Sequence, residues 1–271
     1  MSTRIPFDYH MHSNFSCDCH VTMESMCAEA VRKNIPEIAF TEHFDRVRNG
    51  MCFDRYDAAG FFKELEKMRV KFAPQGLTIK AGVEVGEIHL NRAEVNAVLD
   101  AHPYDLVLGS LHWAGGENIF ERPYFQKRDH QTAARDYFAE LAEMVDGGGF
   151  TIMSHMDVLK RTGYGVYNNH FDIAEYEEYV RPVFAACIRR GIAPEINTSA
   201  LRMPVNQTHP TLEAIRWYKE MGGELLSIGS DSHSPVQLGT GLDKAIQIAK
   251  DAGFTHLTRY AARKVQDQVE I

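Results

Sequence analysis

The segment Ile5-Pro-Phe-Asp-Tyr-His-Met-His12 is a short, mostly apolar run that ends in two histidines. Side chains alternate between the two faces of an extended strand, so His10 and His12 point the same way. Two imidazoles on one face of a strand form half of a metal site. The pattern therefore predicts a buried strand that carries two metal ligands near its carboxyl end.

Similar apolar runs recur along the chain, separated by longer amphipathic stretches. We expect strands over residues 5–12, 38–43, 78–85, 106–112, 150–155, 193–197, 225–230 and 256–259. We expect helices over residues 22–34, 57–73, 91–100, 131–146, 172–190, 210–222 and 236–252. Thr22 suits a helix N-cap, and Gly191, Gly222 and Gly253 stand where left-handed residues end a helix.

Strands that alternate with helices indicate an α/β protein with parallel pairing and right-handed crossovers. Seven or eight such units favour a barrel, and an open doubly wound sheet is the alternative. No low-complexity segment, charge block or Pro/Ser-rich linker interrupts the 271 residues. We therefore expect one domain over residues 1–271.

The charge balance bears on the partner. The net charge is −8, from 29 basic and 37 acidic residues. This sign disfavours a protein that grips nucleic acid by its backbone, so no nucleic-acid partner is expected. It is compatible with a small charged substrate that meets a local positive site.

The sequence contains no run of 18 apolar residues and no apolar run that would serve as a secretory leader. These features predict a soluble, cytoplasmic protein without membrane contact. The sequence does not specify the oligomeric state.

The five cysteines are predicted to be unpaired thiols: Cys17, Cys19, Cys27, Cys52 and Cys187. Their odd number and the length of the chain argue against a disulfide framework. Cys17 and Cys19 precede His20, which would suit a zinc site. Unpaired loop thiols are preferred, because no second cysteine pair completes a tetrahedral set.

Residue types that bind metals recur at the predicted strand ends. They are His10, His12, Glu42, His43, Glu84, His112, His155, Asp157, Asp231 and His233. A single histidine at a strand end is more often a hydrogen-bonded core residue. Recurrence on six units favours a metal cluster, since buried imidazoles and carboxylates gathered at one barrel mouth need cations to neutralise them.

The other histidines fall at helix starts, in loops or outside the strand-end pattern. They are His89, His102, His130, His170, His209 and His256. We expect these six to be surface residues. His20 lies near the predicted mouth of the barrel and is given no role.

The strand-end segments resemble the motifs of the PHP (polymerase and histidinol phosphatase) superfamily. The segments are His10-Met-His12, Thr41-Glu42-His43, Gly82-Val83-Glu84, Ser110-Leu111-His112, Ser154-His155 and Gly229-Ser-Asp-Ser-His233. The resemblance implies a distorted, TIM-like (β/α)7 barrel, in which an eighth strand would be peripheral. Within the superfamily the chain most resembles histidinol-phosphate phosphatases, through residues 155–161 and 195–202.

The resemblance also implies ligands for up to three divalent transition-metal ions. One ion would take His10, His12, Glu84 and Asp231, which would hold the catalytic water. A second would take Asp18, His43 and His233. A third would take Glu84, His112 and His155, so that Glu84 bridges. Mixed nitrogen and oxygen ligands suit zinc, iron or manganese, and the sequence does not choose among them.

The implied reaction is hydrolysis of a small phosphate monoester, most closely L-histidinol phosphate, by a metal-activated water. Arg161 and Arg202 follow predicted strands, and a guanidinium presents a planar fork to phosphate oxygens. Lys160 is a further candidate for substrate binding. Two alternatives stay open: a PHP phosphoesterase that acts on a nucleotide or oligonucleotide, and a non-catalytic PHP module.

Overall fold

Six parallel strands form the main sheet of a computed structural model that describes residues 4–271. The strand order in this sheet is β1-β2-β3-β6-β7-β8. The strands are β1 (Glu37–Phe44), β2 (Thr78–Gly86), β3 (Leu108–Ser110), β6 (Ile152–Met153), β7 (Ala193–Asn197) and β8 (Ser227–Gly229). Strands that follow one another in this order are parallel neighbours, as the alternation of strands and helices predicts.

The segment 7–12 lies between the two edges of this sheet. On one side the Ala39 amide donates to the Asp8 carbonyl (2.9 Å), and on the other the His12 amide donates to the Ser232 carbonyl (2.9 Å). The contacts are isolated bridges and not a regular ladder, so the predicted strand over residues 5–12 is irregular. The six strands and this segment together form the wall of the barrel, and the prediction of a distorted seven-stranded barrel is confirmed.

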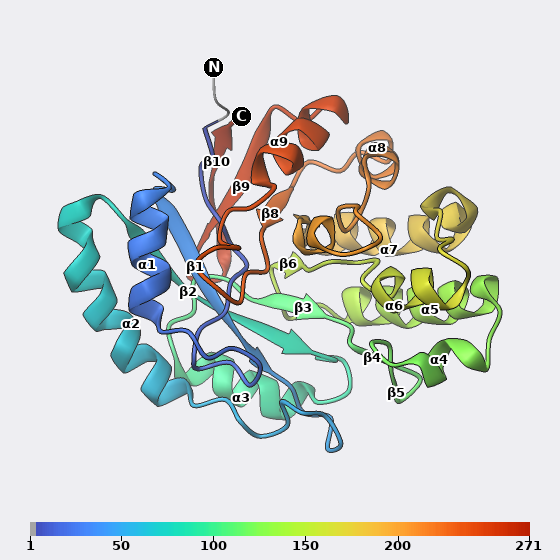
Figure 1. Ribbon diagram of the computed structural model, residues 1–271, viewed down its shortest axis with the longest axis horizontal. Coiled ribbons are helices and arrows are strands. Elements are labelled where there is room, and N and C mark those ends of the chain that lie inside the picture. Colours follow the sequence, from blue (N-terminus) through green and yellow to red (C-terminus); the bar gives the residue numbers. More distant parts are fainter. Residues whose placement is uncertain (1–3) are drawn as a thin grey trace.

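Helices cover the outside of the strands (Figure 1). The α-helices are α1 (Met23–Arg32), α2 (Ala58–Phe72), α3 (Arg92–Ala101), α4 (Arg122–Gln126), α5 (His130–Gly147), α6 (Lys160–Val166), α7 (Glu177–Arg190), α8 (Leu212–Glu220) and α9 (Leu242–Asp251). Short 3-10 turns are η1 (Ala73–Gln75), η2 (Ile173–Tyr176) and η3 (Ser199–Arg202). Buried apolar side chains from these helices and from the strands form a continuous core.

The helix ends agree with the capping residues expected from the sequence. Thr22 Oγ1 accepts a hydrogen bond from the Ser25 amide (3.2 Å) and so caps the first turn of α1. Gly191, Gly222 and Gly253 all have positive φ just past a helix. Two predicted helices begin later than expected, since residues 173–176 form η2 and residues 236–241 lie in turns before α9.

The predicted eighth strand lies outside the barrel. β9 (His256–Ala261) pairs with β10 (Lys264–Glu270) in an antiparallel hairpin. The Thr258 amide donates to the Leu226 carbonyl (2.8 Å), which attaches this hairpin to the chain just before β8. A second two-stranded ribbon, β4 (Trp113–Ala114) with β5 (Glu117–Asn118), follows β3.

Candidate metal centre

The nine side chains predicted as ligands meet at the carboxyl end of the barrel strands. They are His10, His12, Asp18, His43, Glu84, His112, His155, Asp231 and His233. The parallel register accounts for part of the arrangement, because His43 on β1 pairs with Glu84 on β2. β3, β6 and β8 end two or more residues before their ligands, so those ligands lie in the loops that follow the strands.

Glu84 occupies the middle of this cluster and is 1% exposed. One carboxylate oxygen, Oε1, lies 2.9 Å from His155 Nε2 and 3.4 Å from His112 Nε2. The other, Oε2, lies between 3.2 and 3.4 Å from ring nitrogens of His10, His12 and His43. Glu84 therefore has the position that a bridging carboxylate needs.

Asp18 reaches the cluster from the loop before α1. Its Oδ2 lies 3.0 Å from His233 Nε2 and 3.4 Å from His43 Nε2. The side chain is 27% exposed, so Asp18 lies at the edge of the cluster that faces solvent. This position agrees with the predicted set of Asp18, His43 and His233.

Ligand atoms gather in four groups, each within 4.8 Å. The groups are His12, Asp18, His43 and His233; His10, His12 and Asp231; His10, Glu84 and His155; and His43, Asp45 and His112. They differ from the predicted sets in three ways. His12 joins Asp18, His43 and His233; Glu84 groups with His10 and His155 alone; and His112 groups with His43 and Asp45. Sequence reasoning missed Asp45, although it follows His43 at the same two-residue spacing that singled out His12 after His10.

The electrostatics of the cluster suit cations. Burial, together with neighbouring His233 and His43, lowers the pKa of His12 to about 3, so this imidazole is neutral. Burial alone would lower the pKa of His43, but the Glu84 and Asp18 carboxylates outweigh burial and raise that pKa to about 9. Burial would raise the pKa of Glu84, and His43 and His10 instead hold it well below the usual range.

Two buried ring nitrogens show that the cluster fits metal ions. His12 Nε2 and His43 Nδ1 have no hydrogen-bond partner among residues 4–271. A buried polar atom left without a partner costs free energy, and both atoms lie within 3.4 Å of the Glu84 carboxylate. Imidazole nitrogens beside carboxylate oxygens are a ligand set that zinc, iron and manganese accept.

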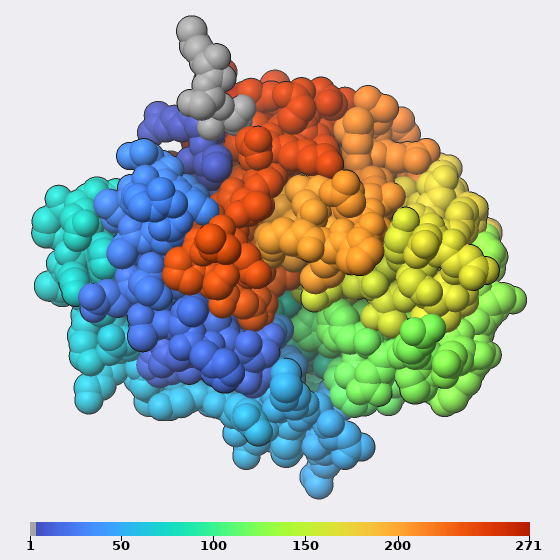
Figure 2. Space-filling view, viewed as in Figure 1, coloured from blue at the N-terminus to red at the C-terminus, as the bar shows by residue number. Residues whose placement is uncertain are grey.

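A cavity of about 440 Å³ opens over the cluster, and Arg161 and Arg202 both line it. Figure 2 shows the face on which the loop before α1 lies beside both the segment after β1 and the segment after β8. The Arg161 guanidinium lies 5.2 Å from the centre of the Phe120 ring, which also lines the cavity. Arg202 Nη2 donates to the Ser230 and Asp231 carbonyls (2.9 and 3.1 Å).

Lys160 does not line this cavity, and its predicted role in substrate binding is wrong. Its side chain is fully buried, and Nζ donates to Asp157 Oδ2 (2.7 Å) and to the Thr208 carbonyl (2.6 Å). His209 Nδ1 lies 2.9 Å from the other oxygen of Asp157. His209 is therefore buried rather than a surface residue as predicted, and no local pattern in the sequence distinguishes it.

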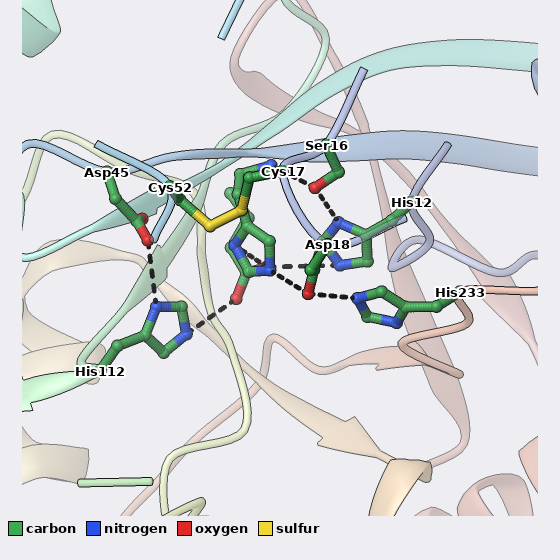
Figure 3. The surroundings of a disulfide bond; sticks show 10 residues. His12, Ser16, Cys17, Asp18, Asp45, Cys52, His112 and His233 are labelled. Atoms are coloured by element: carbon green, nitrogen blue, oxygen red, sulfur yellow. Dashed lines mark hydrogen bonds and ion pairs between the residues drawn. A yellow bond between two sulfur atoms is a disulfide. The ribbon is translucent and has the colours of Figure 1, made fainter. Parts of the chain in front are cut away.

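Cys17 and Cys52 form a disulfide, so the prediction that all five cysteines are unpaired is wrong for these two. Their Cα atoms are 5.1 Å apart, although 35 positions separate them in the sequence. The pairing also excludes the Cys-x-Cys-His zinc site. Figure 3 shows the bond beside Asp18, between the loop before α1 and the loop after β1. Cys19, Cys27 and Cys187 are free, as expected, and all three are buried.

A parallel barrel with clustered histidines and carboxylates at its strand ends has the architecture of metal-dependent barrel hydrolases. Ionised carboxylates and neutral imidazoles can hold several cations, and the arginines can bind an anion above them. Among residues 4–271, no helix is long and apolar enough to cross a membrane.

The chain belongs to the PHP domain family, because residues 8–199 match that family. A histidinol-phosphatase of Lactococcus lactis is 28% identical to it over 95% of each chain. A probable histidinol-phosphatase of Clostridium acetobutylicum is also 28% identical, over 92% of this chain and 94% of its own.

A solved structure agrees with these matches. The histidinol phosphate phosphatase of Lactococcus lactis, complexed with zinc, L-histidinol and phosphate, superposes with a TM-score of 0.86. It is 26% identical in sequence and covers 97% of this chain and 99% of its own. A putative histidinol phosphatase from Listeria monocytogenes, 20% identical over 88% of this chain and 99% of its own, shares the fold with a TM-score of 0.75.

Proposed function

We propose that this protein is a metal-dependent phosphomonoester hydrolase whose substrate is L-histidinol phosphate. The observation that carries the proposal is one cavity in which most of the predicted ligands face Arg161 and Arg202. A phosphate monoester is dianionic, and metal ions held by these ligands would face it on one side of the cavity, with guanidinium groups on the other. The Lactococcus lactis relative, solved with zinc, L-histidinol and phosphate, supports the choice of substrate.

We assign the ligands as the resemblance to PHP proteins implies. His10, His12, Glu84 and Asp231 would hold one metal ion; Asp18, His43 and His233 a second; and Glu84, His112 and His155 a third. Bound transition-metal ions would lower the pKa of a water molecule and neutralise charge on the phosphate. Glu84 suits the bridging role, since its two oxygens face different histidines.

The chain itself supplies binding, orientation and exclusion of water. Arg161 would donate to the phosphate oxygens through its planar fork. Arg202 would do so with Nη1, since Nη2 already holds the backbone at Ser230 and Asp231. Trp113 and Phe120 line the same cavity and would shield the group that carries the phosphate from bulk water.

Zinc is our first choice of metal, because the Lactococcus lactis structure contains it. Iron and manganese also accept imidazole nitrogen with carboxylate oxygen. A full complement of three ions is part of the proposal, since the resemblance to PHP proteins assigns the nine side chains to three sets with Glu84 shared.

The test compares substrates on the metal-loaded full-length chain. Release of inorganic phosphate is measured for L-histidinol phosphate, L-serine phosphate, a nucleoside monophosphate and a labelled oligonucleotide. We expect the highest kcat/KM for L-histidinol phosphate and no cleavage of the oligonucleotide. Preference for a nucleotide or oligonucleotide would contradict the substrate assignment, and no turnover of any compound would indicate a non-catalytic module.

A further inference from the structure

Glu195 lies behind the metal cluster, on β7, and is 1% exposed. Its Oε1 lies 2.8 Å from His10 Nδ1. Its Oε2 accepts hydrogen bonds from the His155 backbone amide (3.0 Å) and from Asn197 Nδ2 (3.1 Å). One buried carboxylate thus contacts two predicted ligands that come from opposite parts of the barrel.

The contact with His10 determines which ring nitrogen faces the cluster. An ionised carboxylate can only accept, so Glu195 requires the proton on His10 Nδ1. When the ring binds a metal ion as a neutral imidazole, the lone pair is therefore on the other nitrogen, Nε2, which faces Glu84 Oε2 (3.2 Å) and Asp231 Oδ1 (3.8 Å). A carboxylate that holds the second nitrogen of a metal-binding histidine fixes the ring orientation and makes it a better ligand.

The contact with His155 acts through the backbone. His155 follows β6 directly after Ser154, and its Nε2 lies 2.9 Å from Glu84 Oε1. Because Glu195 holds the amide of this residue, it fixes where the chain turns from β6 into the cluster. His10 and His155 belong to one group of candidate ligands with Glu84, and Glu195 is attached to both histidines.

Gly229 shows how closely this arrangement is packed. Asn197 pairs with Gly229 across β7 and β8. A Cβ atom added at Gly229 would overlap both Glu195 Oε1 and His10 Cβ. The strand next to Glu195 therefore has to lack a side chain at this position for the carboxylate and the imidazole to meet.

We propose that Glu195 is a positioning residue of the metal centre, which orients the His10 ring and anchors the His155 backbone so that both meet Glu84. This proposal rests on the proposed function only because it takes the cluster as a metal site. It requires no particular substrate. Glu195 does not line the cavity and is not proposed to touch substrate.

The test measures zinc affinity of the full-length chain in metal-buffered solutions, with bound zinc determined by elemental analysis. Glu195→Gln keeps the size of the side chain but replaces one carboxylate oxygen, which accepts hydrogen bonds, with an amide group that donates them. We expect a loss of zinc affinity of roughly tenfold to a hundredfold. Hydrolysis should recover when free zinc is raised, and Glu195→Asp, which keeps the charge with a shorter reach, should lose less affinity.

The matched control is Glu37→Gln, which changes another buried glutamate on a barrel strand. Glu37 bonds the Tyr9 hydroxyl and lies at the amino end of β1, away from the cluster. This variant should keep wild-type zinc affinity. Equal zinc affinity in wild type, Glu195→Gln and Glu195→Asp would overturn the proposal, even if stability fell. If Glu195→Gln does not fold, the Glu195→Asp comparison alone decides.

Zinc binding separates failure of this proposal from failure of the proposed function. A weaker zinc site in Glu195→Gln supports the positioning role whether or not L-histidinol phosphate is hydrolysed. Unchanged zinc affinity contradicts that role even if the wild-type protein proves to be the proposed phosphatase.

Discussion

At the scale of the residue, Glu84 holds the cluster together, because five histidine rings approach its two oxygens. Its pKa lies well below the usual range, since the charges of His43 and His10 outweigh the effect of burial. The carboxylate is therefore ionised at neutral pH. Removing one ligand around it should weaken metal binding without removing the core that holds the barrel.

His112→Ala and Asp231→Asn should each lower turnover by orders of magnitude while the fold survives. Asp231 has positive φ (51°), a conformation that asparagine also tolerates, so this substitution changes the ligand and leaves the backbone unstrained. The measurements are turnover, metal content and circular dichroism. His170→Ala is the control, because His170 is half-exposed and lies outside the cluster. Near-normal turnover in either variant would remove that residue from the ligand set.

Arg161 tests how the phosphate is bound. Arg161→Lys keeps the charge but loses the bidentate fork, so kcat/KM should fall, and Arg161→Ala should be worse. A charge-assisted hydrogen bond contributes about 1.5–3 kcal/mol, or about tenfold to a hundredfold in kcat/KM. Metal content should not change, because arginine is not a ligand.

Arg135→Ala is the matched control, because Arg135 is exposed on α5 and does not line the cavity. It should leave kcat/KM unchanged. Unaltered kcat/KM in Arg161→Ala would show that Arg161 does not bind phosphate. Arg202→Ala is a less direct test, since Arg202 also bonds the backbone at Asp231.

At the scale of the element, the Cys17–Cys52 disulfide ties the loop that carries Asp18 to the loop after β1. Closing a loop of this length restricts the unfolded chain, which is worth about 3–4 kcal/mol in the chain-entropy account. A reductant should lower the free energy of unfolding, measured by urea titration, by about 3–4 kcal/mol. The Cys17→Ser/Cys52→Ser double variant should be insensitive to reductant.

Thiol titration of the denatured chain checks the pairing directly. Of the five cysteines, three are free, so three thiols should react before reduction and five after it. Five thiols without reductant would contradict the pairing. Disulfides are rare in a reducing cytoplasm. The Cys17–Cys52 pairing therefore disagrees with the predicted cytoplasmic location. The same thiol titration on protein isolated under anaerobic conditions tests this point.

At the scale of the whole molecule, the regular alternation of strands and helices favoured a barrel but left an open doubly wound sheet as the alternative, and the resemblance to PHP proteins implied the seven-stranded barrel. This alternation did not distinguish the seventh extended segment of the barrel from a strand of the C-terminal hairpin. The segment 7–12 bonds both sheet edges through isolated bridges, whereas the ladder of β9 is formed with β10, in a hairpin whose register shifts once. Both segments have the sequence pattern of a strand, and the tertiary contacts show that the segment 7–12 closes the barrel.

The candidate site was predictable to the extent that its residues follow strands. His10, His12 and His43 stand at strand ends, so their convergence follows from parallel pairing. Asp18 lies in a loop and came only from the resemblance to PHP proteins. Lys160 and His209 were misplaced for a related reason. Lys160 pairs with Asp157 only three residues earlier, but the burial of this pair depends on Thr208 and His209, which lie about fifty positions away in the sequence and which no local spacing signals.

The central claim is that the cluster at the barrel mouth binds metal ions that hydrolysis of L-histidinol phosphate requires. The direct measurement is phosphate release by one preparation as isolated, after removal of metal by a chelator, and after zinc is restored, with metal content determined at each stage. We predict more than one transition-metal equivalent per chain at first, loss of both metal and activity with the chelator, and recovery of both with zinc. Full hydrolysis by the metal-stripped protein would contradict the account.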